Sequence, residues 1–392
     1  MLAVVPVYSR TVEVYEVGIF QIATAIALIA QPLVTMRLEM ITPATKSLVL
    51  AKRRTKRAYV VSATAGVGAV LAGILLRPLD LATGELLLSA GLLILAYAWI
   101  ATDNAMLIRL GLLKALAWRN AVAGVLAAAL QLAAALWLPS AVALAAAMLL
   151  GRGVAILITR GRGPERTEQE DDASDDADFG PARAVPAMLA GVVTAGALQS
   201  LMLTTSVIFG PLGSAQLGMA QRIAGTPTSL VGQGLSQAVA ARASEIVRAR
   251  SPQLNPYIKR VTLRLVAIAL MVGAGLAVLG PLLAVPVLGP EWATAGTLIA
   301  VLSPPLALFL VLVPTMPVMV LIHRERMLLA LNVVRLVAIV GATAIAGALT
   351  GQLVATAAVT SGVWSASYLL SLLVLMSLSR KWDVEMRKSA GE

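Results

Sequence analysis

Eleven apolar runs follow one another along this chain, and each can cross a bilayer, which takes about 20 apolar residues in a helix. They cover roughly 17–40, 58–76, 86–107, 120–138, 141–159, 184–209, 214–240, 262–288, 294–322, 327–349 and 353–378. Because the runs are long and continuous rather than short and alternating, they exclude a closed barrel. The sequence therefore predicts an all-α membrane protein, a polytopic helical bundle.

The composition agrees with a membrane protein and excludes several kinds of metal and disulfide site. Hydrophobic residues make up 59% of the chain and charged residues 13%, whereas a soluble domain has about 25% charged residues. Cysteine is absent and His323 is the only histidine, so the chain cannot form a disulfide, a thiolate zinc site or a His-rich metal site. We predict no metal site and no cofactor. The start MLAVVPVY has no basic region before it, so no cleavable signal peptide is expected.

The basic residues define the two sides of the membrane. A basic run, 52–57, could suggest phosphate binding, but no stacking aromatics or reading motif accompany it, so nucleic-acid binding is not expected. With this run in the cytoplasm and the sides alternating at each span, 25 of the 31 Lys and Arg residues fall on the cytoplasmic side. Only Arg10 and Arg77 fall on the other side. This asymmetry predicts a multi-pass protein of the cell (cytoplasmic) membrane, with membrane lipids as partners of the basic run.

One long polar connection divides the chain. It lies between the fifth and sixth runs, holds eight of the 20 acidic residues and has the composition of a disordered cytoplasmic linker. The predicted organisation is an N-terminal transmembrane lobe at 1–160, the linker at 161–183, a C-terminal transmembrane lobe at 184–378 and a cytoplasmic tail at 379–392. The start reads like the outer end of a span, so we expect a largely missing first helix and two lobes of about six helices.

A short internal repeat supports two related lobes. Glu16-Val-Gly18-Ile-Phe-Gln21 opens one span, and Gln216-Leu-Gly218-Met-Ala-Gln221 opens another 200 residues later. Each is followed by a proline within its span and then by a basic connection. Halves that repeat in the same orientation are a known arrangement in transporters.

Charged residues within the spans are the candidate site residues, because charge in hydrocarbon is costly and usually faces a partner or a watery cavity. Arg37 and Glu39 lie near the cytoplasmic end of their span, where a cavity role competes with snorkelling or topology marking. Arg222 lies about a third of the way into its span, which favours a cavity or ion-pair role. For Arg335, about two turns in from a cytoplasmic end, a cavity role and an interfacial role are both open.

Two further charges have narrower interpretations. Asp103 is the candidate for coupling to a proton or sodium ion, or else an ion-pair partner of Arg109. Arg152 is expected to be an interfacial anchor. The glycines Gly66, Gly68 and Gly73 are more typical of close helix packing than of a ligand site.

Prolines within the spans mark the expected kinks, because each removes a backbone hydrogen bond. In a moving protein these would be hinges, and otherwise they only shape the helices. The six hinge candidates are Pro32, Pro227, Pro304, Pro305, Pro314 and Pro317.

Three stretches resemble the polysaccharide (lipid-linked oligosaccharide) flippases of the multidrug/oligosaccharidyl-lipid/polysaccharide exporter superfamily. The first is Pro6-x-x-Ser9-Arg10 with Gly18-x-Phe20 and Met36-Arg37-Leu38-Glu39-Met40. The second is Leu217-Gly218-x-x-x-x-Arg222 with Pro227, Gly232, Ser236 and Arg242-x-x-Glu245. The third is Leu288-Gly289-Pro290-Glu291-Trp292 with the proline-rich span and His323-Arg324 after it. The resemblance extends over the whole chain except the linker, and it departs from the family in the missing first span.

The resemblance implies two six-helix lobes around a central cavity that opens to one side at a time. The cargo would be an oligosaccharide on a polyprenyl pyrophosphate, flipped across the membrane for surface polysaccharide biosynthesis, with a polymerase and glycosyltransferases as possible partners. Four of the six charged candidates are cationic, as a cavity for a diphosphate requires.

Other function classes compete with flipping. A cation-coupled multidrug exporter of the same superfamily is the main alternative. Carboxylates deep in the membrane and aromatic residues lining the cavity would favour it. However, aromatic residues make up only 4% of the chain, and Asp103 is the one deep carboxylate, with Glu39 near the interface. A membrane enzyme is not expected, because the outer connections FGPLGS and GALTGQ are short and the inner ones lack clustered acid–base residues outside the linker. A non-transporting scaffold is the third class.

Overall fold

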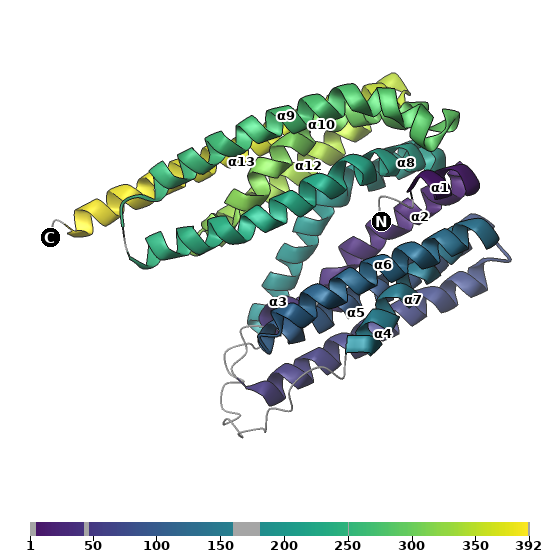
Figure 1. Cartoon of the computed structure of the whole chain (residues 1–392), viewed down its shortest axis with the longest axis horizontal. Coiled ribbons are helices and arrows are strands. Elements are labelled where there is room, and N and C mark those ends of the chain that lie inside the picture. The colour runs from purple at the N-terminus through teal and green to yellow at the C-terminus, as the bar shows by residue number, and fades with distance from the viewer. Residues whose placement is uncertain (1–4, 43–46, 160–180, 250, 391–392) are drawn as a thin grey trace. The chain divides into compact units, whose positions relative to one another are not determined.

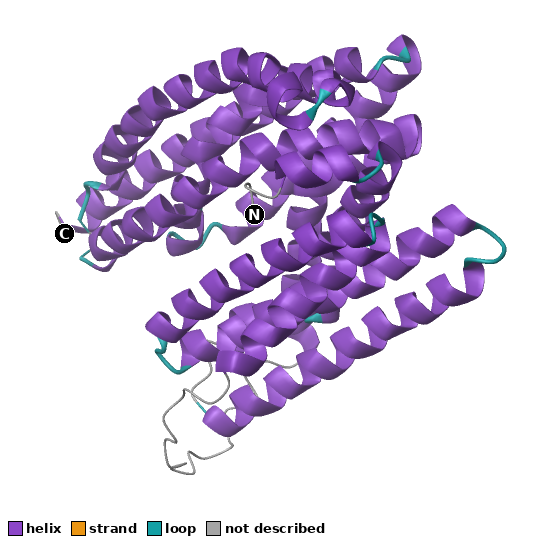
Figure 2. Ribbon diagram, turned by 45° about the vertical axis from the view of Figure 1, so that its right-hand side comes forward, coloured by secondary structure: helices purple, strands orange, loops and turns teal. Residues whose placement is uncertain are grey.

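The computed structural model describes residues 5–42, 47–159, 181–249 and 251–390, which fold into helices joined by short connections (Figures 1 and 2). Within these ranges, ten helices are long and apolar enough to cross a membrane. One of them, at 188–225, covers parts of two predicted spans. The predicted class, an all-α polytopic membrane protein, is confirmed.

Contacts between residues divide the chain into two compact units. Unit 1 comprises Met1–Ser206 and Gly210–Ala215, and unit 2 comprises Val207–Phe209 and Gln216–Glu392. The helices of unit 1 are α1 (Val5–Thr11), α2 (Val14–Val34), α3 (Leu38–Ile41), α4 (Leu48–Leu76), α5 (Leu81–Arg109), α6 (Leu113–Trp137), α7 (Ala141–Thr159) and the first part of α8 (Pro181–Arg248). Unit 2 holds the rest of α8, then α9 (Leu254–Leu288), η5 (Pro290–Trp292), α10 (Ala293–Thr315), α11 (Pro317–Leu321), α12 (Glu325–Thr350) and α13 (Leu353–Ala390).

The two units meet in sequence at a break in α8. Gly210 has φ 65° and ψ −164°, a backbone conformation that is open to glycine and strained for other residues. The break separates the predicted spans 184–209 and 214–240. Within α8, the residues up to Ser206 belong to unit 1, although the sequence predicts that residues from 184 onward belong to the C-terminal lobe; Val207–Phe209 belong to unit 2 and Gly210–Ala215 to unit 1. The predicted linker at 161–183 lies almost wholly outside the described residues, so that boundary stays a prediction.

The predicted span 17–40 is also broken. Helix α2 ends at Val34, and Met36 and Arg37 take positive φ values of 52° and 55° before α3 begins. The Arg37 N–H still donates to the Pro32 carbonyl at 3.2 Å, and the Met36 N–H donates to Leu33 at 3.0 Å. A proline one turn earlier and two left-handed residues therefore interrupt the predicted span before its last turn, which forms α3.

The first residue of each sequence repeat hydrogen-bonds to backbone groups at the start of another helix in its own unit. Glu16 of α2 accepts the N–H of Ala141 at 2.7 Å, at the start of α7. Gln216 of α8 accepts the N–H of Ala295 at 2.9 Å, near the start of α10, and donates to the Glu291 carbonyl at 2.8 Å. Both side chains thus satisfy backbone groups at a neighbouring helix end, where no intrahelical partner exists. This supports the predicted relation between the two halves of the chain.

Two aspartate side chains accept the free backbone N–H groups at the starts of α5 and α9. The Asp80 carboxylate accepts the Thr83 hydroxyl at 2.6 Å and the N–H groups of Ala82 and Thr83 at the start of α5. The hydrogen bonds from Thr83 lower the pKa of the Asp80 carboxyl. In unit 2, Asp383 of α13 accepts the N–H groups of Leu254 and Asn255, each at 3.0 Å, and so joins the start of α9 to the end of α13.

Glycines bring α4 and α5 into close contact. A Cβ atom added at Gly91 would lie 2.6 Å from the Gly66 carbonyl oxygen, and one added at Gly73 would lie 2.7 Å from the Leu88 nitrogen. Gly68, by contrast, has nothing within 4 Å of such an atom. Two of the three glycines singled out in the sequence therefore serve close packing, as predicted, and Gly68 does not.

We expect Gly73→Leu to destabilise the protein, because the new side chain must displace the backbone of α5. Forcing atoms into a packed interface costs about 1–3 kcal/mol. Gly68→Leu is the matched control on the same helix and should leave the thermal unfolding midpoint in detergent unchanged. Equal midpoints for the two variants would mean that the close approach of α4 and α5 is wrong.

Candidate functional site

Among the described residues, one arginine in each unit is buried among polar groups. In unit 1 it is Arg119 of α6, which has no exposed surface. In unit 2 it is Arg335 of α12, which is 5% exposed. Because a guanidinium cannot be deprotonated in a protein, each site must stabilise a full positive charge within a span.

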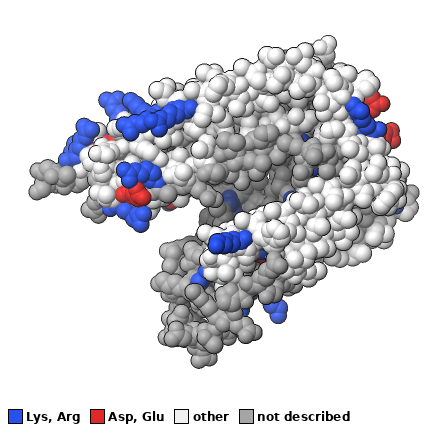
Figure 3. All heavy atoms as spheres, in the orientation of Figure 1, with Lys and Arg blue, Asp and Glu red and all other residues white. Residues whose placement is uncertain are grey.

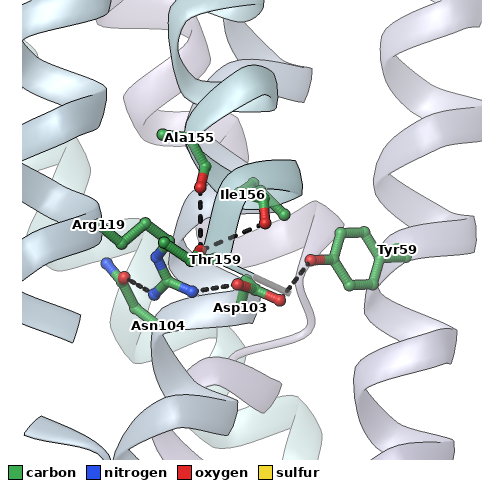
Figure 4. A network of polar contacts seen from close by, with 7 residues as sticks. All are labelled: Tyr59, Asp103, Asn104, Arg119, Ala155, Ile156 and Thr159. Carbon is green, nitrogen blue, oxygen red and sulfur yellow. Dashed lines mark hydrogen bonds and ion pairs between the residues drawn. The ribbon is translucent and has the colours of Figure 1, made fainter. Parts of the chain in front are cut away.

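Figure 4 shows the Arg119 cluster, made of Tyr59, Asp103, Asn104 and Arg119. One Arg119 Nη donates to Asp103 Oδ2, and the other donates to Asn104 Oδ1. The Tyr59 hydroxyl donates to Asp103 Oδ1 at 3.2 Å. The cluster therefore joins α4, α5 and α6 and neutralises the guanidinium with a carboxylate from the adjacent helix.

The sequence of α6 explains why Arg119 points inward. Arg119, Ala123, Ala127, Gln131 and Ala135 are all buried and recur every four residues, so they form one face of the helix. The small residues on this face allow a close approach to α7, where a Cβ atom at Gly151 would lie 2.4 Å from the Ala127 nitrogen. The guanidinium lies at the end of that buried face.

The ion-pair partner of Asp103 differs from Arg109, the partner considered as one alternative from the sequence. Spacing along α5 suggests Arg109, and the structure gives Arg119 instead. The predicted span began at residue 120, which counted Arg119 among the cytoplasmic cations, but α6 already begins at Leu113. The four-residue recurrence of small and polar residues after Arg119 was the signal that could have placed it inside.

The Arg335 cluster holds its cation without a carboxylate. Arg335 donates to Asn332 Oδ1 at 3.1 Å and to Ser371 Oγ at 3.0 Å, and its guanidinium lies over the Tyr368 ring, 4.5 Å from the centroid. The Trp364 ring lies beside Tyr368, with centroids 5.9 Å apart. Within the described part of the chain, no acidic group pairs with Arg335, and its Nε has no hydrogen-bond partner. The partners of this charge among the described residues are neutral dipoles and an aromatic face.

Other predicted candidates lie elsewhere. Arg37, at the break after α2, is partly buried, and its guanidinium lies against Gly191 of α8, where an added Cβ atom would be 2.2 Å from Nε. Glu39 in α3 is partly buried, and its Oε2 has no hydrogen-bond partner among the described residues. Arg222 is partly buried in the unit 2 part of α8. Arg152, the predicted interfacial anchor, has its guanidinium 4.0 Å from the centroid of the Tyr97 ring.

The hinge candidates fall into two groups. Pro32 precedes the break after α2, and Pro314 and Pro317 flank the junction of α10 and α11. Pro304 and Pro305 lie inside the continuous helix α10, and Pro227 lies in α8 with its side chain outside the described ones. Pro281 and Pro286 in α9 are further interior prolines that the sequence prediction left out.

Known structures with the same fold are transporters. No protein-family model matches the chain, and no curated protein matches it either. A multidrug resistance transporter of the MATE family, in the MOP superfamily and in an inward-facing conformation, is 18% identical, with 99% of this chain and 96% of that chain covered at a TM-score of 0.62. MATE in complex with MaD5 is 16% identical (TM-score 0.57), and MATE in complex with MaD3S is 17% identical (TM-score 0.55); each match covers 99% of this chain and 89% of that one.

The chain is therefore a multi-pass helical membrane protein. Its fold is that of MATE transporters of the MOP superfamily. The resemblance seen in the sequence is supported at this level. The flippase subfamily and the missing first helix stay predictions.

We expect Asp103→Leu to destabilise the protein strongly, because it leaves Arg119 buried with no counter-charge. Breaking one side of a buried ion pair typically costs about 3–5 kcal/mol. The double variant Asp103→Leu with Arg119→Leu should recover much of that loss, since it removes both charges. Unfolding in detergent measures the stability of the single and double variants. Arg109→Gln, which removes a neighbouring cation, is the control. A double variant as unstable as the sum of the two single variants would contradict the pairing.

Proposed function

We propose that this chain is a membrane transporter that works by alternating access and exports small organic molecules. The observation that carries the proposal is the match of nearly the whole chain to MATE transporters, one of which bears the name multidrug resistance transporter. The division into two compact units supports it, because alternating access needs bodies that can move as wholes. This favours a cation-coupled multidrug exporter over a flippase.

We propose Asp103 as the residue that couples export to a cation. Its side chain is 19% exposed, so an ion can reach it. Tyr59 and Asn104 place further oxygen atoms beside the carboxylate. Sodium or a proton would compete with Arg119 for Asp103. The exchange would loosen the connection between α5 and α6, which gives the ion a means to favour one conformation.

A second candidate function, flipping of a polyprenyl-pyrophosphate-linked oligosaccharide, is favoured by one observation. Arg335 is buried with neutral partners only, so the described part of its surroundings lacks the negative charge that a diphosphate would supply. On this hypothesis Arg37, Glu39 and Arg222 would also line the path of the cargo. A polysaccharide polymerase and glycosyltransferases would be its partners.

Two assays on the same variants separate the candidates. The chain is expressed in cells without their own drug exporters, where retention of a fluorescent organic cation is measured, and in a flippase-deficient strain, where surface polysaccharide is measured. We expect the wild-type chain to lower dye retention. Asp103→Asn should abolish export per molecule of inserted protein, measured alongside, because the coupling carboxylate is gone. Arg264→Gln, which removes an exposed cation, is the control.

The contrary result would be restored surface polysaccharide without dye export. In that case Arg335→Ala should lower the polysaccharide about tenfold or more, the scale of one lost charge-assisted contact, while Arg335→Lys recovers part of it. Neither activity from a normally inserted protein would contradict both candidates and favour a scaffold.

A further inference from the structure

We propose that a groove between α9 and α10 binds an anionic phospholipid of the surrounding membrane. The two helices pack side by side in unit 2 (Figure 1) and form a groove with a volume of about 370 Å³. The α9–α10 groove is lined from α9 by Val266, Ala269, Leu270, Gly273, Ala274 and Ala277. From α10 it is lined by Ser303, Pro304, Ala307, Leu308 and Val311.

The groove exists because small residues follow one face of α9. Val266, Ala269, Gly273 and Ala277 recur at spacings of three and four, which places them on a single helical stripe. Opposite them is Ala307, whose Cβ would lie 3.1 Å from a Cβ atom added at Gly273. Larger side chains on either helix would fill the space. The lining offers one side-chain hydroxyl, from Ser303, so an ordered water would find few partners there.

The occupant is expected to come from the bilayer. Only 11% of the most apolar stretch of α9 is buried within the chain. Leu263, Leu270 and Met271 next to the groove are 73%, 68% and 70% exposed. In a membrane this surface faces hydrocarbon, and an acyl chain matches a narrow apolar groove that runs along a helix.

Charge at one end of the groove selects the headgroup. Lys259 is exposed and lies seven residues before Val266, which places it on the same stripe about 10 Å nearer the start of α9. Arg260 is exposed on a neighbouring face, and Arg264, five residues after Lys259, is exposed on the opposite face. Figure 3 shows Lys and Arg side chains gathered at this end of unit 2, where α9 begins and α13 ends. A phosphate at Lys259 would leave an acyl chain beside Val266 and Gly273, so the charge and the groove fit one anionic lipid.

The test measures lipid retention by the full-length protein and does not depend on what it transports. Purified protein is titrated with phosphatidylglycerol or with phosphatidylcholine of the same chains, and bound lipid is counted by native mass spectrometry. We expect phosphatidylglycerol to bind more tightly. Lys259→Gln should weaken it about fivefold, the factor that one cation near an anionic surface contributes. Arg264→Gln removes the same charge from the opposite face and should change little.

A second pair of variants tests the groove itself. Gly273→Leu fills it, while Gly275→Leu adds the same side chain where nothing lies within 4 Å. We expect only Gly273→Leu to abolish retention, and we expect phosphatidylglycerol with a photoreactive acyl chain to label the 266–277 segment. Unchanged thermal midpoints in both variants separate lost binding from lost folding. The proposal would be overturned by equal binding of the two lipids or by equal effects of the two leucine substitutions. It would also be overturned by a dimer that Gly273→Leu disrupts, because a second copy of the chain would then occupy the groove.

Discussion

A backbone that crosses hydrocarbon must hydrogen-bond to itself, and this constraint shapes the structure more than any side-chain contact. It makes every span a helix, and it limits where a helix can break. The breaks at Gly210 and at Thr35–Arg37 occur where a residue takes positive φ. At the second of them, N–H groups find carbonyls in the preceding turn. Glu16 and Gln216 meet the same requirement at helix ends, since the side chain of each accepts a backbone N–H at the start of a neighbouring helix.

The two buried arginines are stabilised in different ways, and the difference bears on function. Arg119 has a carboxylate and an amide from α5, so its charge is matched inside the protein. Arg335 has an amide, a hydroxyl and an aromatic face, all of which are neutral. A matched pair suits a connection between helices that an arriving cation can loosen. A cation whose described partners are all neutral suits the attraction of negative charge, which is why Arg335 supports the second candidate function.

Much of the fold follows from the sequence because length and apolarity alone specify a membrane helix. The spans and the helix pairs with close glycines could be predicted on that basis. The start of α6 is harder to predict, because Lys114 and Arg119 both look like residues of an aqueous connection. Lys114 is indeed exposed, and only the four-residue recurrence after Arg119 indicates that Arg119 is buried. The choice of Arg119 rather than Arg109 as the partner of Asp103 depends on how α5 and α6 pack, and no local pattern encodes it. One neutral partner of Arg335, Ser371 of α13, lies 36 residues further along the chain. This contact likewise cannot be predicted from a local sequence pattern.

Alternating access is tested most directly by measuring distances between the two units. The chain has no native cysteine, so spin labels can be placed at Lys114→Cys on α6 and Arg326→Cys on α12, both exposed positions. Electron–electron double resonance in lipid nanodiscs then gives the distribution of distances between them. A transporter of this kind should show two populations, with a ratio that changes when sodium, pH or an organic cation is varied. A single distribution that none of these changes would contradict alternating access.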